Sequence, residues 1–307
     1  MTGQNGQLDF RGGMTTAMSD SCANCGTPLG GEFCAQCGQA RADIKRPVWS
    51  LVTDTIDGIV SWDGRLLSTY RQLFTRPGSV ARNYMDGKRQ SFTPPVRLYL
   101  IVSLLFFAAM TVSDIRIIAV DLTADGPTDA GVRVTMFQPP RQEAPPQIPP
   151  EVQADLLRQL EEAGGGGWRE VARIAMNEPE VLEQRSSAAA SQGFILMVVL
   201  FGLFCAILHP RRRMIEHAVH ALYFHAAILL PFAAGLIASV LIPMPMVVAL
   251  TVAAILLLAF VTGLLLFDRG FYGSSWIGAG LRTAALLPAY AFAAIVVGLG
   301  MIFLGTL

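Results

Sequence analysis

Charged residues are scarce in this sequence, and those present cancel. Aspartate, glutamate, lysine and arginine make up 15% of the 307 residues, where about a quarter is usual in soluble proteins. The 23 basic and 23 acidic residues leave no net charge, so the composition indicates no nucleic-acid partner. Hydrophobic residues make up 52%, and the mean hydropathy is +0.47. These values exclude a disordered chain, a collagen-like chain and a small disulfide-stapled scaffold.

Sequence motifs that would identify a reaction are also missing. No G-x-x-x-x-G-K-[ST] phosphate-binding loop occurs, and residues 273–278 lack the G-x-S-x-G spacing of a nucleophile elbow. Residues 1–21 contain no apolar core of a signal peptide, and we expect them to form a disordered tail. The sequence therefore gives no reaction and no substrate.

Five long apolar stretches dominate the rest of the chain. About 20 apolar residues cross the hydrocarbon core of a bilayer, and none of these stretches carries aspartate, glutamate or lysine in its middle. This lack disfavours an ion-coupled transporter, which usually needs such residues within the membrane. One such stretch could be a buried core helix, but five in one chain indicate membrane spans. We expect spans at residues 96–112, 188–208, 217–242, 246–267 and 284–304.

Basic residues gather on one side of the expected spans. They are frequent between Arg65 and Arg97, ahead of the first span, and at positions 211–213, between the second and third spans. Arg269 and Arg282 lie between the fourth and fifth spans. Basic loops stay in the cytoplasm when a membrane protein inserts. We therefore expect a cytoplasmic N-terminus and an extracytoplasmic C-terminus.

Four of the five cysteines form two C-x-x-C-G pairs, Cys22 with Cys25 and Cys34 with Cys37. The glycine after each pair supplies the positive φ that this turn needs. Two such turns provide the four sulfur ligands of one tetrahedral zinc ion. So short a segment cannot build a hydrophobic core, so the metal would supply the folding free energy. We expect a zinc ribbon over residues 22–40, with one structural zinc in a closed, non-catalytic site.

Two alternatives for these cysteines are weaker. Two disulfides are disfavoured on the cytoplasmic side of a membrane. A thioredoxin-like redox pair would need a βαβ context, which the sequence lacks. The fifth cysteine, Cys205, lies within the second expected span and is interpreted as a small buried apolar side chain.

The segment of residues 41–95 predicts amphipathic, basic juxtamembrane helices. Apolar residues recur at helical spacing from Val48 to Val60 and from Leu66 to Phe74, and Pro77 with Gly78 interrupts the pattern. Basic residues beside apolar ones, next to a span, suit anionic lipid headgroups. A basic nucleic-acid patch is the alternative, but membrane topology already explains the same arginines.

The segment of residues 113–187 is acidic, rich in proline and glycine, and expected outside the cytoplasm. It lacks a sustained apolar face, so a folded binding domain is not expected. We predict a flexible linker or a small helical hairpin, with helices over residues 151–163 and 168–176.

All four histidines lie near the cytoplasmic ends of the second and third expected spans. They are His209, His217, His220 and His225, and Glu216 adjoins them. The E-H-x-x-H order differs from the H-E-x-x-H of zinc proteases, so that geometry is not implied. Three interpretations stay open: hydrogen bonding between helices with headgroup contact, a metal or catalytic site, and a proton-transfer or lipid role.

Several motifs occur in a characteristic order along the chain. The two cysteine turns are followed by T-R-P-G and Y-x-x-G-K-R between Thr75 and Arg89, Pro94-Pro95 before a span, E-H with A-L-x-F-H ending at His225, and R-G-F-Y-G. In this order the sequence resembles the bacterial membrane-protein family catalogued as domain of unknown function 3667. The resemblance covers most of residues 22–290 except the extracytoplasmic segment.

The resemblance implies a multi-span bacterial inner-membrane protein with a tethered zinc ribbon and no established activity. Where the family often has a further histidine, this chain has Tyr223, and its extra histidine is His220; this departure weakens a fixed metal-ligand role for the cluster. The positions that match the family pattern are Arg76, Pro77, Gly78, Tyr84, Gly87, Lys88, Arg89, Glu216, His217 and His225.

The expected fold class is mainly α: a polytopic helical membrane protein with an N-terminal cytoplasmic zinc ribbon and amphipathic juxtamembrane helices. The leading hypothesis is a non-enzymatic protein of unknown activity, whose ribbon docks an unknown protein partner while the basic helices contact lipid headgroups. The alternatives are a metal-dependent enzyme acting on a lipid, and a transporter of a small solute or lipid. The candidate functional cluster for these alternatives is Glu216, His217, His220, His225, Arg76, Lys88 and Arg89.

Overall fold

The computed structural model describes residues 21–41, 64–113, 116–124, 130–138, 149–162, 164–242 and 245–306. Within these ranges the chain is mainly helical, and five helices are long and apolar enough to cross a membrane. They are α4 (Pro95–Val112), α7 (Pro179–Leu208), α8 (Met214–Leu241), α9 (Met246–Tyr272) and α10 (Trp276–Gly305). The predicted fold class is thereby confirmed.

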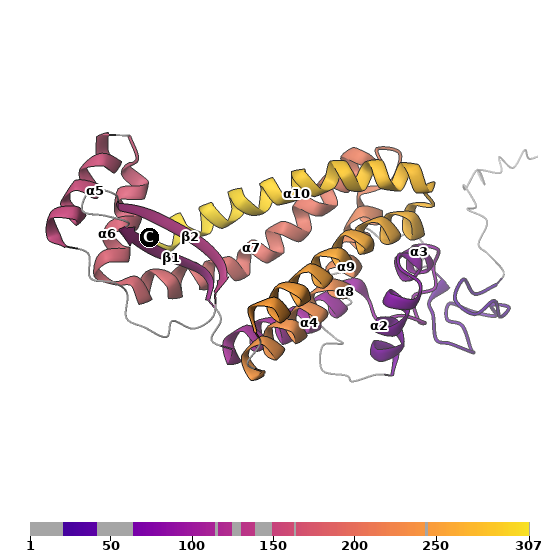
Figure 1. Ribbon diagram of the computed structural model, residues 1–307. Helices are drawn as coiled ribbons and strands as arrows, with labels where there is room; N and C mark the ends of the chain where they lie inside the picture. Colours follow the sequence, from indigo (N-terminus) through magenta and orange to yellow (C-terminus); the bar gives the residue numbers. More distant parts are fainter. Residues whose placement is uncertain are drawn as a thin grey trace, which may run out of the picture.

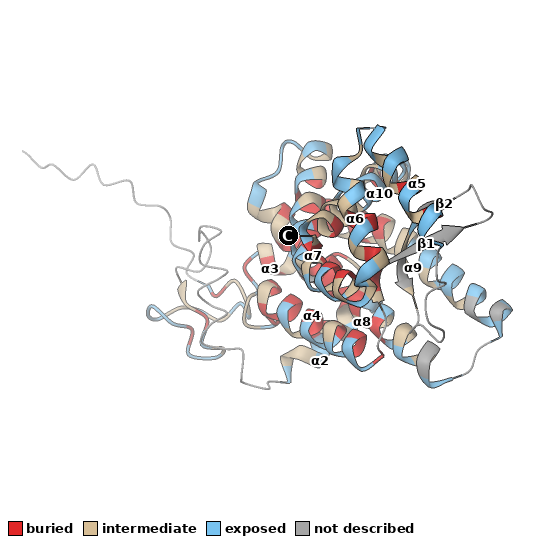
Figure 2. Cartoon of the chain, turned by 90° about the vertical axis from the view of Figure 1, so that its left-hand side faces the viewer, coloured by how far each residue is buried: buried red, intermediate tan, exposed pale blue. Residues whose placement is uncertain are grey.

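The five long helices form one elongated bundle (Figure 1). Helix α4 packs along α8, α7 packs along both α8 and α10, and α9 contacts α8 and α10. Large apolar side chains point outward from the bundle; Leu104, Leu258 and Phe292 are all more than 65% exposed. The burial pattern in Figure 2, with exposed outer faces on the helices around a buried centre, fits contact with lipid chains.

Backbone geometry fixes the turn that joins α9 to α10. Gly273 ends α9 with φ +73°, a left-handed conformation that favours glycine. Ser275 then begins α10, where its Oγ accepts a hydrogen bond of 3.1 Å from the backbone N–H of Gly278. This tight turn brings the end of α9 and the start of α10 together at one end of the bundle.

Two short helices precede the first long one. Helices α2 (Arg65–Thr75) and α3 (Ser79–Met85) pack against α8 and α9 at the end of the bundle opposite α5 and α6 (Figure 1). Leu73 and Val80 are fully buried there, while Leu67 and Phe74 stay exposed. Some apolar side chains of these amphipathic helices therefore pack against the bundle, while others stay on the surface. The predicted helical pattern from Val48 to Val60 lies outside the described residues.

The segment between α4 and the bundle part of α7 contains more structure than expected. Helices α5 (Pro150–Glu162) and α6 (Gly166–Asn177) are accompanied by an antiparallel hairpin of β1 (Arg116–Ala124) and β2 (Ala130–Gln138), which the sequence analysis did not predict. Ile118 is buried against the core, and Arg116 pairs with Glu183 of α7 at 2.6 Å. Helix α7 itself begins well before residue 188, so it is longer than the span predicted from hydropathy.

Candidate metal centre and the arginine-rich end of the bundle

The four cysteines of the two C-x-x-C-G pairs come together in space. Their four sulfur atoms all lie within 4.8 Å of one another. The Sγ atoms of Cys22 and Cys37 are 3.6 Å apart, and those of Cys25 and Cys34 are 3.5 Å apart. None of the four is in a disulfide. Four thiolates about 2.3 Å from a tetrahedral metal would lie roughly 3.8 Å apart. The four cysteines can therefore hold one metal ion, and the alternative of two disulfides is not supported.

The two cysteine turns have nearly the same backbone. The N–H of Gly26 donates to Cys22 O and that of Gly38 to Cys34 O, both at 2.8 Å, and the two glycines have φ +78° and +73°. Each turn thereby repeats the conformation that the C-x-x-C-G spacing predicts.

The thiol environments differ within this set. Hydrogen bonding to Thr27 lowers the pKa of Cys25 to about 6, whereas loss of hydration raises the pKa of Cys37 to about 11. Of these two thiols, Cys25 gives a thiolate more readily at neutral pH, and a bound metal would hold the ligand thiols deprotonated.

The cysteine ribbon is docked on the loop between α3 and α4. The buried side chain of Gln39 donates from Nε2 to Gly87 O at 2.7 Å. Its Oε1 accepts from the backbone N–H groups of Arg89 and Gln90 at 3.2 and 3.4 Å. One side chain, placed directly after the second cysteine turn, therefore satisfies three backbone groups of the loop.

The first cysteine turn reaches the same loop. Asn24 Oδ1 accepts from the backbone N–H and the Oγ of Ser91 at 3.1 and 2.9 Å. Gly87 has φ +98°, and a Cβ at this position would lie 2.9 Å from that of Ala23. The loop is thus shaped to receive both turns, and we call this contact the ribbon dock.

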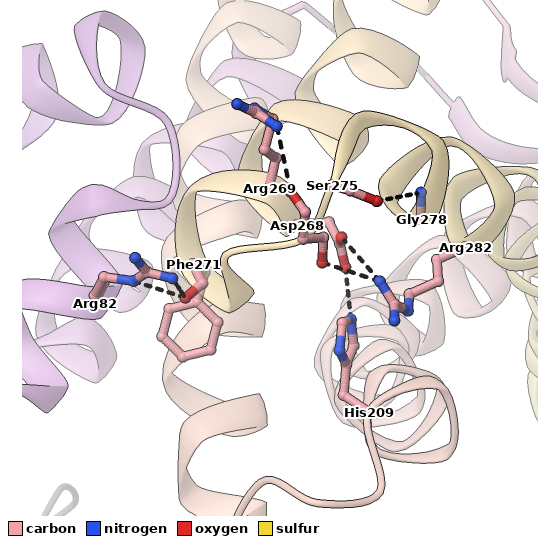
Figure 3. A network of polar contacts seen from close by, with 9 residues as sticks. Arg82, His209, Asp268, Arg269, Phe271, Ser275, Gly278 and Arg282 are labelled. Atoms are coloured by element: carbon pink, nitrogen blue, oxygen red, sulfur yellow. Dashed lines mark hydrogen bonds and ion pairs between the residues drawn. The ribbon is translucent and has the colours of Figure 1, made fainter.

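The T-R-P-G motif lies against the R-G-F-Y-G motif at the end of α9. Arg82 donates from Nε and Nη2 to Phe271 O at 2.9 and 2.7 Å, as Figure 3 shows. A Cβ on Gly270 would fall 1.9 Å from Pro77 O, and one on Gly78 would fall 2.5 Å from Phe271 N. The two backbones approach so closely that only glycine fits at both positions.

A carboxylate that the sequence analysis left out occupies the middle of this end. Asp268 Oδ1 lies 2.6 Å from His209 Nε2, and its Oδ2 lies 3.9 Å from Nη1 of Arg282 (Figure 3). Arg282 also donates to Ser274 Oγ at 3.0 Å. Hydropathy predicts that the fourth span ends at residue 267, but α9 continues to Tyr272. Asp268 therefore lies within the helix and is 9% exposed. The sequence feature that could have indicated this residue is the position of its carboxylate, directly after an apolar stretch.

The histidines contact α9 and α10, and within the described residues no hydrogen bond joins two of them. His217 Nδ1 pairs with the hydroxyl of Tyr272 of α9 at 2.7 Å. His225 donates from Nδ1 to Ala221 O, so its Nε2 accepts from Tyr290 of α10 at 2.8 Å when the ring is neutral. His220 stacks on Phe271 with ring centroids 5.0 Å apart.

Glu216 makes its hydrogen bonds at the start of α8. It caps α8 by accepting from Arg213 N, and it pairs with Arg212, both at 3.2 Å. Across the described ranges, the four cysteines are the only group of three or more potential metal ligands within reach of one ion. Glu216 and the histidines therefore do not form a common coordination set there.

The three basic residues of the predicted functional cluster, Arg76, Lys88 and Arg89, do not lie in one site. Arg76 lines a cavity between α3 and the α9–α10 turn. Lys88 Nζ lies 3.4 Å from Asn83 Oδ1, and the guanidinium of Arg89 lies 5.5 Å from the ring centroid of Tyr84. Lys88 and Arg89 thus belong to the loop under the ribbon, and Arg76 does not.

Comparison with known families gives one match. The family model described as protein of unknown function (DUF3667) matches residues 63–107, which include α2, α3, the loop of the ribbon dock and most of α4. This agrees with the resemblance seen in the motifs. No curated protein and no solved structure matches the chain.

Proposed function

We propose that this chain is a bacterial inner-membrane protein whose cytoplasmic ribbon holds one structural Zn²⁺ and acts as an assembly module. The observation that carries the proposal is the ribbon dock, in which Gln39 and Asn24 hold the loop of residues 87–91. That loop connects α3 to the first span. A metal that orders the ribbon would thereby order the entrance to the bundle.

Zinc is the metal that the donor set favours. Four thiolates in a tetrahedral arrangement are typical of structural zinc sites, and such a site leaves no open position for a substrate. A cytoplasmic location keeps these thiols reduced and available to the metal. The proposed role is therefore structural, and the metal takes part in no reaction.

The distribution of arginine supports a cytoplasmic ribbon. Residues 211–213, Arg269 and Arg282 lie at the end of the bundle that carries α3 and the ribbon dock, and the positive-inside rule places such an end in the cytoplasm. Five spans then put the C-terminus outside. Reporter fusions at the two termini test this orientation.

A protein partner would meet the ribbon on its free side. Phe33, next to the second cysteine turn, is 66% exposed, while Gln39 and Asn24 face the loop. We propose this side as the docking surface for a further protein, because exposed aromatic side chains are enriched where proteins associate.

The test combines metal content with limited proteolysis of the full chain in detergent. We expect one zinc per chain, lost in the C22S/C25S double variant. Trypsin should cut after Lys88 and Arg89 slowly in the wild type, and much faster in the double variant or after chelation, because loss of the ribbon releases the loop. Cutting after the exposed Arg173 of α6 is the internal control. Loss of zinc without faster cutting at the loop would refute the assembly role.

A further inference from the structure

An open cavity of about 640 Å³ lies between α3 and the α9–α10 turn. Its polar wall is formed by three arginines and three serines: Arg76, Ser79, Arg82, Arg269, Ser274 and Ser275. No acidic side chain is among the described residues that line it. The cavity therefore combines several positive charges with hydroxyl donors.

Two of the three arginines, Arg82 and Arg269, are held by uncharged groups. Arg82 donates twice to Phe271 O. Arg269 donates to Ser274 O at 3.3 Å, and its guanidinium lies 4.1 Å from the ring centroid of Trp276. Figure 3 shows both side chains beside the turn that joins α9 to α10. Their positions are thus fixed by the backbone and by an aromatic ring.

The ion pairs of the described residues do not include these three arginines, Arg76, Arg82 and Arg269. A guanidinium has five N–H donors, and the contacts above use two on Arg82 and one on Arg269. The remaining donors are available to an anion.

The close packing around the cavity depends on glycine. Gly273 lines it, and a Cβ there would lie 2.8 Å from Nη2 of Arg82. Gly270 lines it as well and leaves room for the carbonyl of Pro77. Side chains at these two positions would displace Arg82 and the connection between α2 and α3 from the end of α9.

We propose that this cavity binds a phosphate group. Guanidinium groups bind phosphate through two parallel hydrogen bonds, and serine hydroxyls can complete the shell. Two sources share this chemistry, a phospholipid headgroup and a soluble phosphate. Leu266 of α9 and Pro77 add an apolar wall next to a candidate span, which favours the lipid. None of the lining residues belongs to the ribbon, so this proposal stands apart from the metal.

The experiment is a calorimetric titration of the full chain in a neutral detergent. The probes are inorganic phosphate and a short-chain phosphatidylglycerol, and the variants are R76Q, R269Q and R71Q. Arg71 is an exposed arginine of α2 that does not line the cavity, and it serves as the matched control. We expect R76Q and R269Q each to raise the Kd about tenfold, since each removes charged hydrogen bonds to the ligand, and R71Q to leave the Kd unchanged.

The two probes separate the two sources. Binding of phosphatidylglycerol alone identifies a lipid headgroup, and binding of inorganic phosphate with similar affinity identifies a soluble phosphate; both outcomes support the cavity. The proposal is overturned if the wild type binds neither probe. It is also overturned if R71Q loses as much affinity as R76Q and R269Q do, because that would indicate a diffuse effect of charge. Gel-filtration elution and a thermal-unfolding midpoint in detergent equal to those of the wild type establish that each variant is folded. The R76K variant keeps the positive charge but lacks the parallel N–H donors of a guanidinium, so it should bind with intermediate affinity.

Discussion

At the scale of the residue, Gln39 connects the metal centre to the rest of the chain. It directly follows a cysteine turn and satisfies a carbonyl and two N–H groups of the loop at residues 87–90. Buried backbone groups that lose their partners cost free energy, because water no longer reaches them. The amide of Gln39 thus makes three of the hydrogen bonds that hold the ribbon on the loop, beside those that Asn24 accepts from Ser91.

We predict that the Q39A variant separates metal binding from docking. Zinc content should be unchanged, since all four cysteines remain. The ribbon dock should lose about 1–3 kcal/mol, enough to speed tryptic cutting after Lys88 and Arg89 by about fivefold to a hundredfold. Asn24→Ala, which affects a more exposed contact, should have a smaller effect. Unchanged cutting in Q39A would contradict the proposed role of this side chain.

At the scale of the element, the contact between the α2–α3 connection and the end of α9 is made by backbone on both sides. Gly78 and Gly270 permit this approach, and Arg82 fastens it by bonding Phe271 O. Two regions separated by almost two hundred residues thus share one surface. The same contact forms a wall of the cavity between α3 and the α9–α10 turn.

We predict that Gly270→Ala destabilises the protein, whereas Gly280→Ala does not. A Cβ at residue 270 would lie 1.9 Å from Pro77 O, but one at residue 280 meets nothing within 4 Å. Crowding against backbone costs about 1–3 kcal/mol, while alanine in place of glycine within α10 should gain about 0.5–1 kcal/mol. Thermal unfolding in detergent measures both. Equal midpoints for the two variants would show that the backbone contact is unimportant.

The histidines show where sequence spacing misleads at this scale. His217, His220 and His225 are neighbours in sequence, which suggested a common site. In the structure, His217 contacts α9 through Tyr272, and His225 contacts α10 through Tyr290. Two of the three rings, His217 and His225, make a hydrogen bond to another helix, as the first of the three interpretations expects, whereas His220 packs among aromatic rings. Within the described residues, the four cysteines are the only group of three or more potential metal ligands close enough for one ion, and the proposal of a lipid-directed enzyme stays a prediction.

At the scale of the whole molecule, the parts set by local pattern were the ones that sequence could predict. The five long helices follow from hydropathy, and the cysteine set follows from C-x-x-C-G spacing. The ribbon dock joins residues far apart in sequence, Gln39 and Gly87, and no local pattern encodes it. Asp268 was missed because hydropathy ends a span where charge begins, whereas the helix continues.

The β-hairpin was missed for a different reason. Its β-branched residues, Ile117, Ile118 and Val120, lie in a segment whose proline, glycine and acidic content suggested a linker. Two strands gain their stability from packing on a helix rather than from their own sequence. The contact of β1 with α7 supplies that packing.

The bundle should survive loss of the ribbon, which is the prediction for the whole molecule. The main hydrophobic core contains no residue of the described ribbon. We expect Cys25→Ser to abolish zinc binding while helicity and membrane insertion stay as in the wild type. Circular dichroism and resistance to carbonate extraction measure these properties. Cys205→Ala, a cysteine change within α7, should keep the zinc; degradation of the spans in Cys25→Ser would mean that the ribbon is not a separable module.

The ribbon dock also sets an order of events during synthesis. A ribosome makes residues 22–40 before the loop at 87–91, and domains fold as they emerge. The ribbon therefore can acquire its metal while its binding surface on the same chain does not yet exist. When that surface emerges, the first long helix follows it directly. A ribbon that folds early would thus be ready to receive the loop as soon as the loop emerges.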